Sequence, residues 1–255
     1  MISPLAYIDP DAKIGTNVEI APFAFIDKNV IIGDNNIIMP HANILYGTRI
    51  GNGNRIFPGT VIGAIPQDLK FKGEETTAEI GDNNLIRENV TINRGTAAKR
   101  HTIIGNNNLL MESAHVAHDV IVGSNCIIGN STKMGGEVVV DDNAIISASV
   151  LIHQFCHIGG YVMVQGGSRF SKDVPPYIIA GRDPIAYCGL NLVGLRRHKF
   201  TEEQIENIHN AYRIIYMSGL NKTDAKSKIE NEMKLTPEIK YIIDFIESSE
   251  RGIIK

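Results

Sequence analysis

Large apolar side chains recur along the N-terminal two thirds of the chain at intervals of six residues. Every sixth position from Ile2 to Ile62 is isoleucine, eleven in succession. The same phase resumes at Ile80 and runs to Phe170, so that 26 of the 29 positions hold Ile, Leu, Val, Met or Phe. Hydrophobic residues make up only 43% of the chain, and a random order would fill about a dozen of these positions. The period of six is therefore a property of the fold.

A period of six fits neither an amphipathic helix, which repeats every 3.6 residues, nor a plain alternating strand. It fits a short strand with two inward residues, at the anchor and two before it, followed by a corner. Small side chains such as Ala24 and Ala42 usually hold the position two before the anchor. Glycine often follows the anchor, and asparagine often stands three residues after it, and both tolerate the positive φ of a tight corner. These asparagines are Asn17, Asn29, Asn35, Asn83, Asn107, Asn125 and Asn143.

The pattern resembles the hexapeptide repeat, whose family fold is a left-handed parallel β-helix with three hexads, or 18 residues, in each coil. The handedness comes from that resemblance, because sheet physics alone favours a right-handed crossover. We therefore expect a mainly β domain over residues 1–173 with about nine coils stacked around an isoleucine core. Asp68, Glu74 and Ala98 interrupt the anchors. The interruptions predict two extruded loops, at residues 63–79 and 93–103, and such loops often lie on a binding face.

The last third of the chain has a different pattern. Residues 174–190, which contain Pro175-Pro176, are expected to be a linker, and residues 191–255 a helical C-terminal domain. Thr201-Glu-Glu-Gln204 is a capping box that opens a helix ending near Gly219. A second helix is expected over about 223–234, and Thr236-Pro237 begins a third. These helices either only cap the open end of the solenoid or also form part of a binding surface.

Composition narrows the class of protein. The 255 residues carry a formal net charge of −3, which argues against a general nucleic-acid binder. Three cysteines without a CxxC pair fit reduced thiols better than a disulfide framework. The N-terminus has no basic region followed by an apolar run, and no stretch approaches the ~18 apolar residues of a membrane span. We expect a cytoplasmic protein without stable membrane insertion.

The densest cluster of titratable side chains in the repeat is His115, His118 and Asp119. Val116 is the inward anchor, so the histidines lie on the outer side or at a corner. With 18 residues per coil, Gly136 stacks on His118, followed by Gln154. A histidine base beside a side-chain-free backbone N–H supplies two parts that acyl transfer needs, a general base and an oxyanion donor. Solvated surface histidines and a simple turn glycine are the alternatives.

Longer motifs carry a more specific resemblance, which covers nearly the whole chain. They are GAIPQDLKFKGE, IGDNNLIRENVTINRGT, NLLMESAHVAHD, HQFCHIGGYVMVQGG, KDVPPYIIAGRDP and GLNLVGLRRHKF. Together they resemble the UDP-N-acetylglucosamine acyltransferases that begin lipid A synthesis. The resemblance implies transfer of a long-chain (R)-3-hydroxyacyl group from acyl carrier protein, which carries it on phosphopantetheine, to the 3-hydroxyl of UDP-N-acetylglucosamine. It implies a homotrimer with the active site between prisms, and no cofactor or metal.

The resemblance also assigns roles to residues. His118 would be the general base, Asp119 would orient it, and the Gly136 N–H would hold the oxyanion. Gly166 would be the stop that sets acyl length, nearly three coils or ~14 Å from His118 along the axis. The basic stretch 196–199, with Arg169 and Lys172, would face the acidic carrier. The remaining substrate contacts would be Gln67, Asp68, Lys70, His115, His153, Gln154, Asn191 and Arg197.

The chain departs from the family pattern at three positions. The family often has histidine where this chain has Asn93 and Glu137, and a second arginine where it has His198. Four other functions stay open on sequence alone. They are the related N-acyltransferase of the next acylated sugar, a small-molecule O-acetyltransferase that uses acetyl-CoA, a zinc-binding β-helix and a non-catalytic solenoid. The sequence does not decide between UDP-N-acetylglucosamine and its 3-amino analogue as acceptor.

Overall fold

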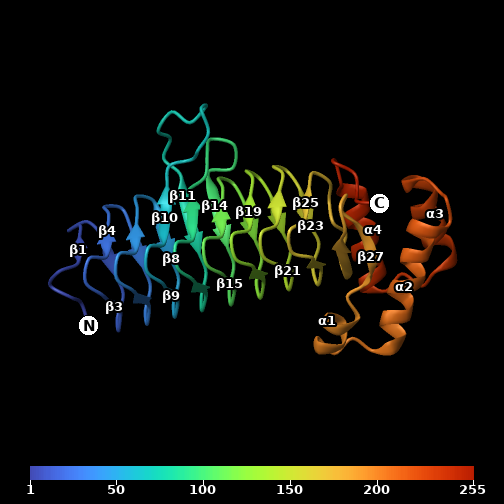
Figure 1. Ribbon diagram of the computed structural model, residues 1–255, viewed down its shortest axis with the longest axis horizontal. Coiled ribbons are helices and arrows are strands. Elements are labelled where there is room, and N and C mark those ends of the chain that lie inside the picture. Colours follow the sequence, from blue (N-terminus) through green and yellow to red (C-terminus); the bar gives the residue numbers. More distant parts are fainter.

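The structure is a computed structural model that describes all 255 residues. Residues 7–170 form a three-sided prism, and a helical region packs at its C-terminal end (Figure 1). Each strand pairs in parallel with the third strand after it, so three sheets form the three sides. The predicted left-handed parallel β-helix with a helical tail is confirmed.

The strands are short, and most have two residues because a corner follows every anchor. The nine-stranded side contains β1 (Tyr7–Ile8), β4 (Phe25–Ile26), β7 (Asn43–Ile44), β10 (Val61–Ala64), β13 (Thr91–Asn93), β16 (His115–Val116), β19 (Lys133–Met134), β22 (Leu151–Ile152) and β25 (Arg169–Phe170). The eight-stranded side contains β2 (Lys13–Ile14), β5 (Ile31–Ile32), β8 (Thr48–Ile50), β11 (Thr77–Ile80), β14 (His101–Ile104), β17 (Ile121–Val122), β20 (Val139–Val140) and β23 (His157–Ile158).

The third side continues beyond the repeat. Its ten strands are β3 (Glu19–Ile20), β6 (Ile37–Ile38), β9 (Arg55–Ile56), β12 (Leu85–Ile86), β15 (Leu109–Leu110), β18 (Ile127–Ile128), β21 (Ile145–Ile146), β24 (Met163–Val164), β26 (Ile178–Gly181) and β27 (Ala186–Leu190). Strand β26 pairs with β24 in parallel, and β27 pairs with β26 antiparallel. Residues 174–190 are therefore not the linker that the sequence predicted. They add two strands to the sheet, because the backbone groups of the last coil need partners.

The anchors form the core as the period predicted. Ile26, Ile44 and Ile62 have no exposed surface, and neither has Val116. All seven asparagines expected at corners adopt positive φ, between 54° and 62°. The glycines after the anchors serve another purpose than the predicted one. Gly15 has no positive φ, but a Cβ there would lie 2.7 Å from the carbonyl oxygen of Gly33 on the next coil. Close stacking of coils, rather than backbone strain, requires glycine at that position.

The two extruded loops are shorter than predicted. Paired positions on β10 and β13 are 30 residues apart and those on β13 and β16 are 24 apart, against 18 elsewhere. The loops span 65–76 and 94–100. The predicted ranges 63–79 and 93–103 were too wide, because the four-residue strands β11 and β14 pair with each other at the loop bases. The longer loop projects from the prism (Figure 1), and its Ile65 and Leu69 are exposed.

Four helices complete the chain: α1 (Leu192–Arg197), α2 (Glu202–Met217), α3 (Lys222–Glu232) and α4 (Pro237–Ser248). The predicted capping box is present, since Thr201 accepts from the Gln204 N–H while the Gln204 side chain accepts from the Thr201 N–H. The sequence did not predict α1. The Tyr212 hydroxyl donates to the Pro176 carbonyl, and the Tyr241 hydroxyl accepts from the Gly160 N–H. These bonds fix the helices on the end of the prism.

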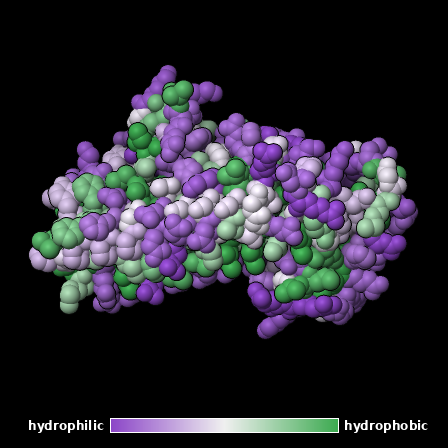
Figure 2. All heavy atoms as spheres, in the orientation of Figure 1, coloured by the Kyte–Doolittle hydropathy of each residue, from purple (hydrophilic) through white to green (hydrophobic).

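The surface of the prism is mostly hydrophilic on the face drawn in Figure 2, with scattered apolar groups that include part of the projecting loop. None of the four helices combines the length and the hydrophobicity that crossing a lipid bilayer requires. Cys126 and Cys156 lie inside the prism, where burial raises the pKa of each thiol to about 12. Both thiols are therefore unreactive core residues.

Candidate active site

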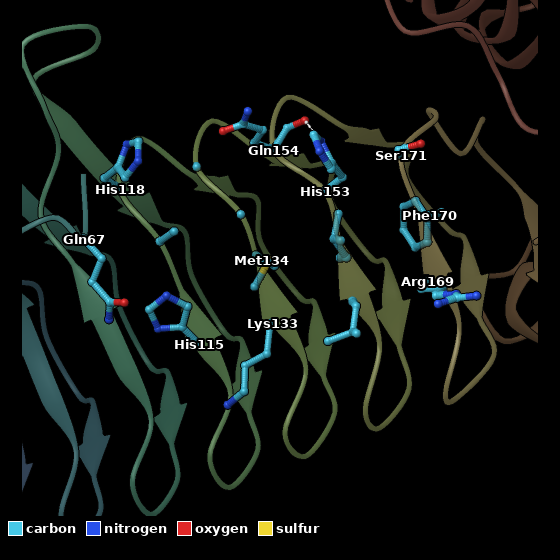
Figure 3. A pocket seen from close by; sticks show the side chains of 15 residues that line it. Gln67, His115, His118, Lys133, Met134, His153, Gln154, Arg169, Phe170 and Ser171 are labelled. Carbon is cyan, nitrogen blue, oxygen red and sulfur yellow. Dashed lines mark hydrogen bonds between the residues drawn. The ribbon is translucent and has the colours of Figure 1, made fainter. Parts of the chain in front are cut away.

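A cavity of about 740 Å³ lies along the nine-stranded side. Figure 3 shows His118, Gln154 and His153 along one edge of this face, with His115, Lys133 and Arg169 lower on the strands. Gln67 reaches the cavity from the longer loop. The lining residues are Gln67, His115, Ala117, His118, Lys133, Met134, Gly135, Gly136, Leu151, Ile152, His153, Gln154, Arg169, Phe170 and Ser171.

His118 and Asp119 form a hydrogen-bonded pair, which we call the catalytic dyad. They lie at the corner between β16 and β17, and His118 Nδ1 is 2.8 Å from Asp119 Oδ2. Neighbours on a strand point in opposite directions, so this contact depends on the corner. Asp119 has a φ of 61°, which brings its carboxylate back beneath the imidazole. The carboxylate keeps the proton of the neutral ring on Nδ1 and leaves Nε2 available in the cavity.

Thr96 holds the other side of Asp119. The Thr96 N–H donates to Oδ1 at 2.9 Å, and the Thr96 hydroxyl donates to Oδ2 at 2.6 Å. Burial by itself would raise the pKa of Asp119, but the hydrogen bonds from Thr96 and His118 outweigh it, and the pKa lies below its ordinary value. The carboxylate is thus ionised and fully hydrogen-bonded although it has no exposed surface. Sequence reasoning missed Thr96, whose only signal was its place in the INRGT motif.

Gly136 lies directly against the imidazole of the dyad. A Cβ at this position would be 2.5 Å from His118 Cε1 and 2.7 Å from Nε2, so only glycine leaves the ring in place. The Gly136 N–H donates to no protein atom. At equivalent corners, an Asp or Asn of the next coil accepts this N–H, as Asn52 does from Asp34 at 2.8 Å. Gln154 occupies that place here without bonding, so the N–H remains free beside Nε2.

Replacing Thr96 by valine should therefore weaken the dyad. The pKa of Asp119 should rise toward its ordinary value, because one of three hydrogen bonds is lost. A depressed carboxyl pKa stabilises the fold above the unfolded pKa, and this stabilisation disappears as the pH falls through the folded pKa. The variant should accordingly unfold at a higher pH in an acid titration followed by circular dichroism, and kcat should fall about tenfold. Thr96→Ser should restore both, and a valine variant equal to the wild type would contradict this role.

Other predicted substrate residues fall into two groups. His115, His153 and Gln154 line the cavity with Gln67. Asp68, Lys70, Gly166, Asn191 and Arg197 do not line it. Asp68 Oδ1 accepts from the Lys70 N–H at 2.9 Å in the projecting loop. Asn191 is buried, caps α1 through Gly194 and donates to the Tyr161 carbonyl.

The three departures from the family pattern have local partners. The Asn93 amide donates to the Ile65 carbonyl at 3.0 Å, at the base of the longer loop. Glu137 lies 3.8 Å from the Lys99 ammonium, so it joins the coil of Gly136 to the shorter loop. His198 packs edge-on against Tyr161 at 5.1 Å between ring centroids. None of the three lines the cavity.

The histidines do not converge on a metal site. His153 lines the cavity, whereas His157 lies on the eight-stranded side and pairs with Asp141 at 2.9 Å. His157 also packs against Phe245 of α4, so it belongs to the contact between prism and tail. No three His, Cys, Asp or Glu side chains of the chain come close enough together to hold a metal ion.

Comparisons with known proteins agree with this geometry. The family model of the second domain of UDP-N-acetylglucosamine O-acyltransferase matches residues 173–254, and the bacterial transferase hexapeptide model matches residues 29–64 and 101–136. A crystal structure of a UDP-N-acetylglucosamine acyltransferase from Bacteroides fragilis 9343 covers 100% of both chains with a TM-score of 0.99 and 76% identity.

Curated relatives carry the same description. The acyl-[acyl-carrier-protein]–UDP-N-acetylglucosamine O-acyltransferase of Sulfurihydrogenibium sp. is 52% identical over 253 residues, which are 99% of this chain and 93% of the relative. That of Chlorobaculum tepidum is 55% identical over 191 residues, 74% of this chain and 72% of the relative. The chain therefore belongs to the family of acyl-[acyl-carrier-protein]–UDP-N-acetylglucosamine O-acyltransferases.

Proposed function

We propose that this acyltransferase moves a long-chain (R)-3-hydroxyacyl group from acyl carrier protein to the 3-hydroxyl of UDP-N-acetylglucosamine, the first step of lipid A biosynthesis. The observation that carries the proposal is the dyad with its free Nε2 beside the unbonded N–H of Gly136. A base and an oxyanion donor at one point are the two groups that ester formation from a thioester requires.

The proposed reaction uses each of these atoms once. Nε2 of His118 takes the proton of the sugar hydroxyl as its oxygen forms a bond to the thioester carbonyl carbon. The carbonyl oxygen becomes an oxyanion and accepts from the Gly136 N–H. The intermediate then expels the thiolate of the carrier's phosphopantetheine, which takes the proton from the imidazolium. Asp119 stabilises that imidazolium, and the carrier's own phosphopantetheine is the only group required besides the two substrates.

The charges of the cavity support an anionic acceptor. Lys133 and Arg169 line it, and none of its 15 lining residues carries a carboxylate. A nucleoside diphosphate sugar brings two negative phosphates, which favours such a wall. Competition between UDP-N-acetylglucosamine and its 3-amino analogue tests the acceptor assignment. The natural sugar should yield an ester that hydroxylamine cleaves, and predominant formation of a stable amide would contradict the proposal.

For the donor, we propose that Gly166 leaves room for an acyl chain of about fourteen carbons or more. Gly166 stands at the corner between β24 and β25, so it borders the nine-stranded side at the edge opposite His118. Leu151, with 52% of its surface exposed, lies on that side and offers apolar contact.

Replacing Gly166 by methionine should shift preference toward shorter donors, because the side chain would block about three or four methylenes worth up to ~0.8 kcal/mol each. Gly166→Ala is the matched control. Its Cβ would lie 3.1 Å from the Ala148 carbonyl oxygen but adds no reach, so the wild-type preference should persist. Product masses from donors of ten to eighteen carbons provide the measurement. An unchanged profile in the methionine variant, or a ten-carbon preference in the wild type, would remove Gly166 from this role.

We further propose that the chain works as a cytoplasmic homotrimer with the cavity between prisms. Exposed apolar side chains on the cavity side and the projecting loop, including Leu151 and Leu69, support a subunit contact there. Lys172, Arg197 and Lys199 are exposed and suit the acidic carrier protein, whereas Arg196 is already paired with Glu202. Sedimentation equilibrium tests the assembly, and an active monomer would contradict it.

A further inference from the structure

His115 is held from both neighbouring strands of the cavity wall. Thr91 on β13 is its register partner on one side, and Lys133 on β19 is its partner on the other. The Thr91 hydroxyl lies 2.7 Å from His115 Nδ1, within hydrogen-bond distance. Lys133 donates its ammonium to the Ser113 carbonyl, which fixes the cation beside the coil of His115. The ring therefore has one nitrogen occupied by Thr91 and the other free.

We propose that Thr91 and Lys133 are positioning residues that hold His115 fixed and uncharged, so that its free nitrogen is a hydrogen-bond partner for the acceptor sugar. The contact with the sugar rests on the function proposed above, whereas the positioning of the ring does not. A neutral imidazole can accept as well as donate at a sugar hydroxyl, but an imidazolium can only donate. An uncharged His115 also adds no positive charge near the imidazolium that forms on His118 during the reaction.

The electrostatic surroundings of His115 support this assignment. Burial, and then the ammonium of Lys133, lower the pKa of His115 below its ordinary value. Thr91 carries no charge on the other side. The remaining titratable side chains that line the cavity are His118, His153 and Arg169, and no carboxylate is present to favour the protonated form. The ring should therefore stay neutral at a pH where an exposed histidine begins to take up a proton.

The experiment is an NMR titration of the intact protein with isotope-labelled histidine rings, in which His115→Asn identifies the His115 signal. Lys133→Met should raise the pKa of His115 toward its ordinary value. Arg169→Met, which removes another cation of the cavity wall two coils further along, should leave it unchanged. Thr91→Val should change the balance of ring tautomers, and Thr91→Ser should retain the wild-type balance. An unchanged pKa in Lys133→Met, or unchanged tautomers in Thr91→Val, would overturn the positioning role.

Kinetics with the same variants separate the role from the proposed function. Thr91→Val should raise KM for UDP-N-acetylglucosamine by about three- to tenfold with kcat nearly unchanged, because a ground-state contact is loosened. Thr91→Ser should restore KM. If the NMR changes appear while KM for the sugar stays constant, the link between His115 and the acceptor is overturned, although the ring is positioned as described. If no acyl transfer to any UDP-sugar occurs, the proposed function fails independently of the titration.

Discussion

Replacing His118 by alanine should lower kcat by about 10²–10⁴-fold, the usual contribution of a general base. The substitution removes the only ring whose free nitrogen lies beside the unbonded Gly136 N–H. The fold should be unaffected, because the imidazole lies at a corner outside the core and is 19% exposed. Steady-state rates measured with saturating acceptor, together with thermal unfolding, provide the test.

A matched control is available in the same prism. His41 is an exposed histidine that stacks on Phe23 and is remote in sequence from the cavity residues. His41→Ala should retain the wild-type kcat. If His118→Ala kept more than about a tenth of the wild-type rate while His41→Ala behaved as expected, His118 would not be the base.

The second large effect concerns Gly136. Gly136→Ala should lower kcat by about 10²-fold, because the new methyl group would overlap the imidazole and push it away from Asp119. The backbone at Gly136 does not have positive φ, so alanine should fold there without strain. Rate measurements and a circular dichroism spectrum of the variant test both statements.

A double variant shows whether the loss acts through the ring. If the methyl group acts only by displacing His118, Gly136→Ala should cost little further activity in a His118→Ala background. Full additivity of the two losses would show that Gly136 does not act through the imidazole. A single variant with unimpaired kcat would mean that the ring tolerates a side chain at this position.

The period of six was sufficient to predict the prism, because every anchor must face a core that no other arrangement of these residues buries. It also placed Gly136 next to His118, since that juxtaposition follows from the coil length alone. Thr96 could not be found in this way, because its contact with Asp119 depends on the path of a loop that interrupts the period. Loop geometry is set by tertiary contacts, and no repeat records it.

Two further features were hidden for related reasons. Asn36, Asn54 and Asn84 are buried at inward positions, where the period predicts apolar side chains. They form a ladder in which the Asn54 N–H donates to the Asn36 side chain at 2.8 Å, and the Asn84 N–H to that of Asn54 at 2.9 Å. Only the stacking of three coils satisfies these amides. In the same way, β26 and β27 became visible only when the unpaired edge of β24 was in place.

The most direct test of the account is the mass of the UDP-sugar formed by the purified protein. UDP-N-acetylglucosamine would be offered 3-hydroxyacyl chains on acyl carrier protein, the same chains on coenzyme A, and acetyl-CoA, with His118→Ala as the blank. The account predicts one product, heavier by a single 3-hydroxyacyl group of about fourteen carbons or more, formed from the carrier-bound donor and nearly absent in the blank. Transfer of acetyl from coenzyme A, or equal product in the His118→Ala reaction, would contradict it.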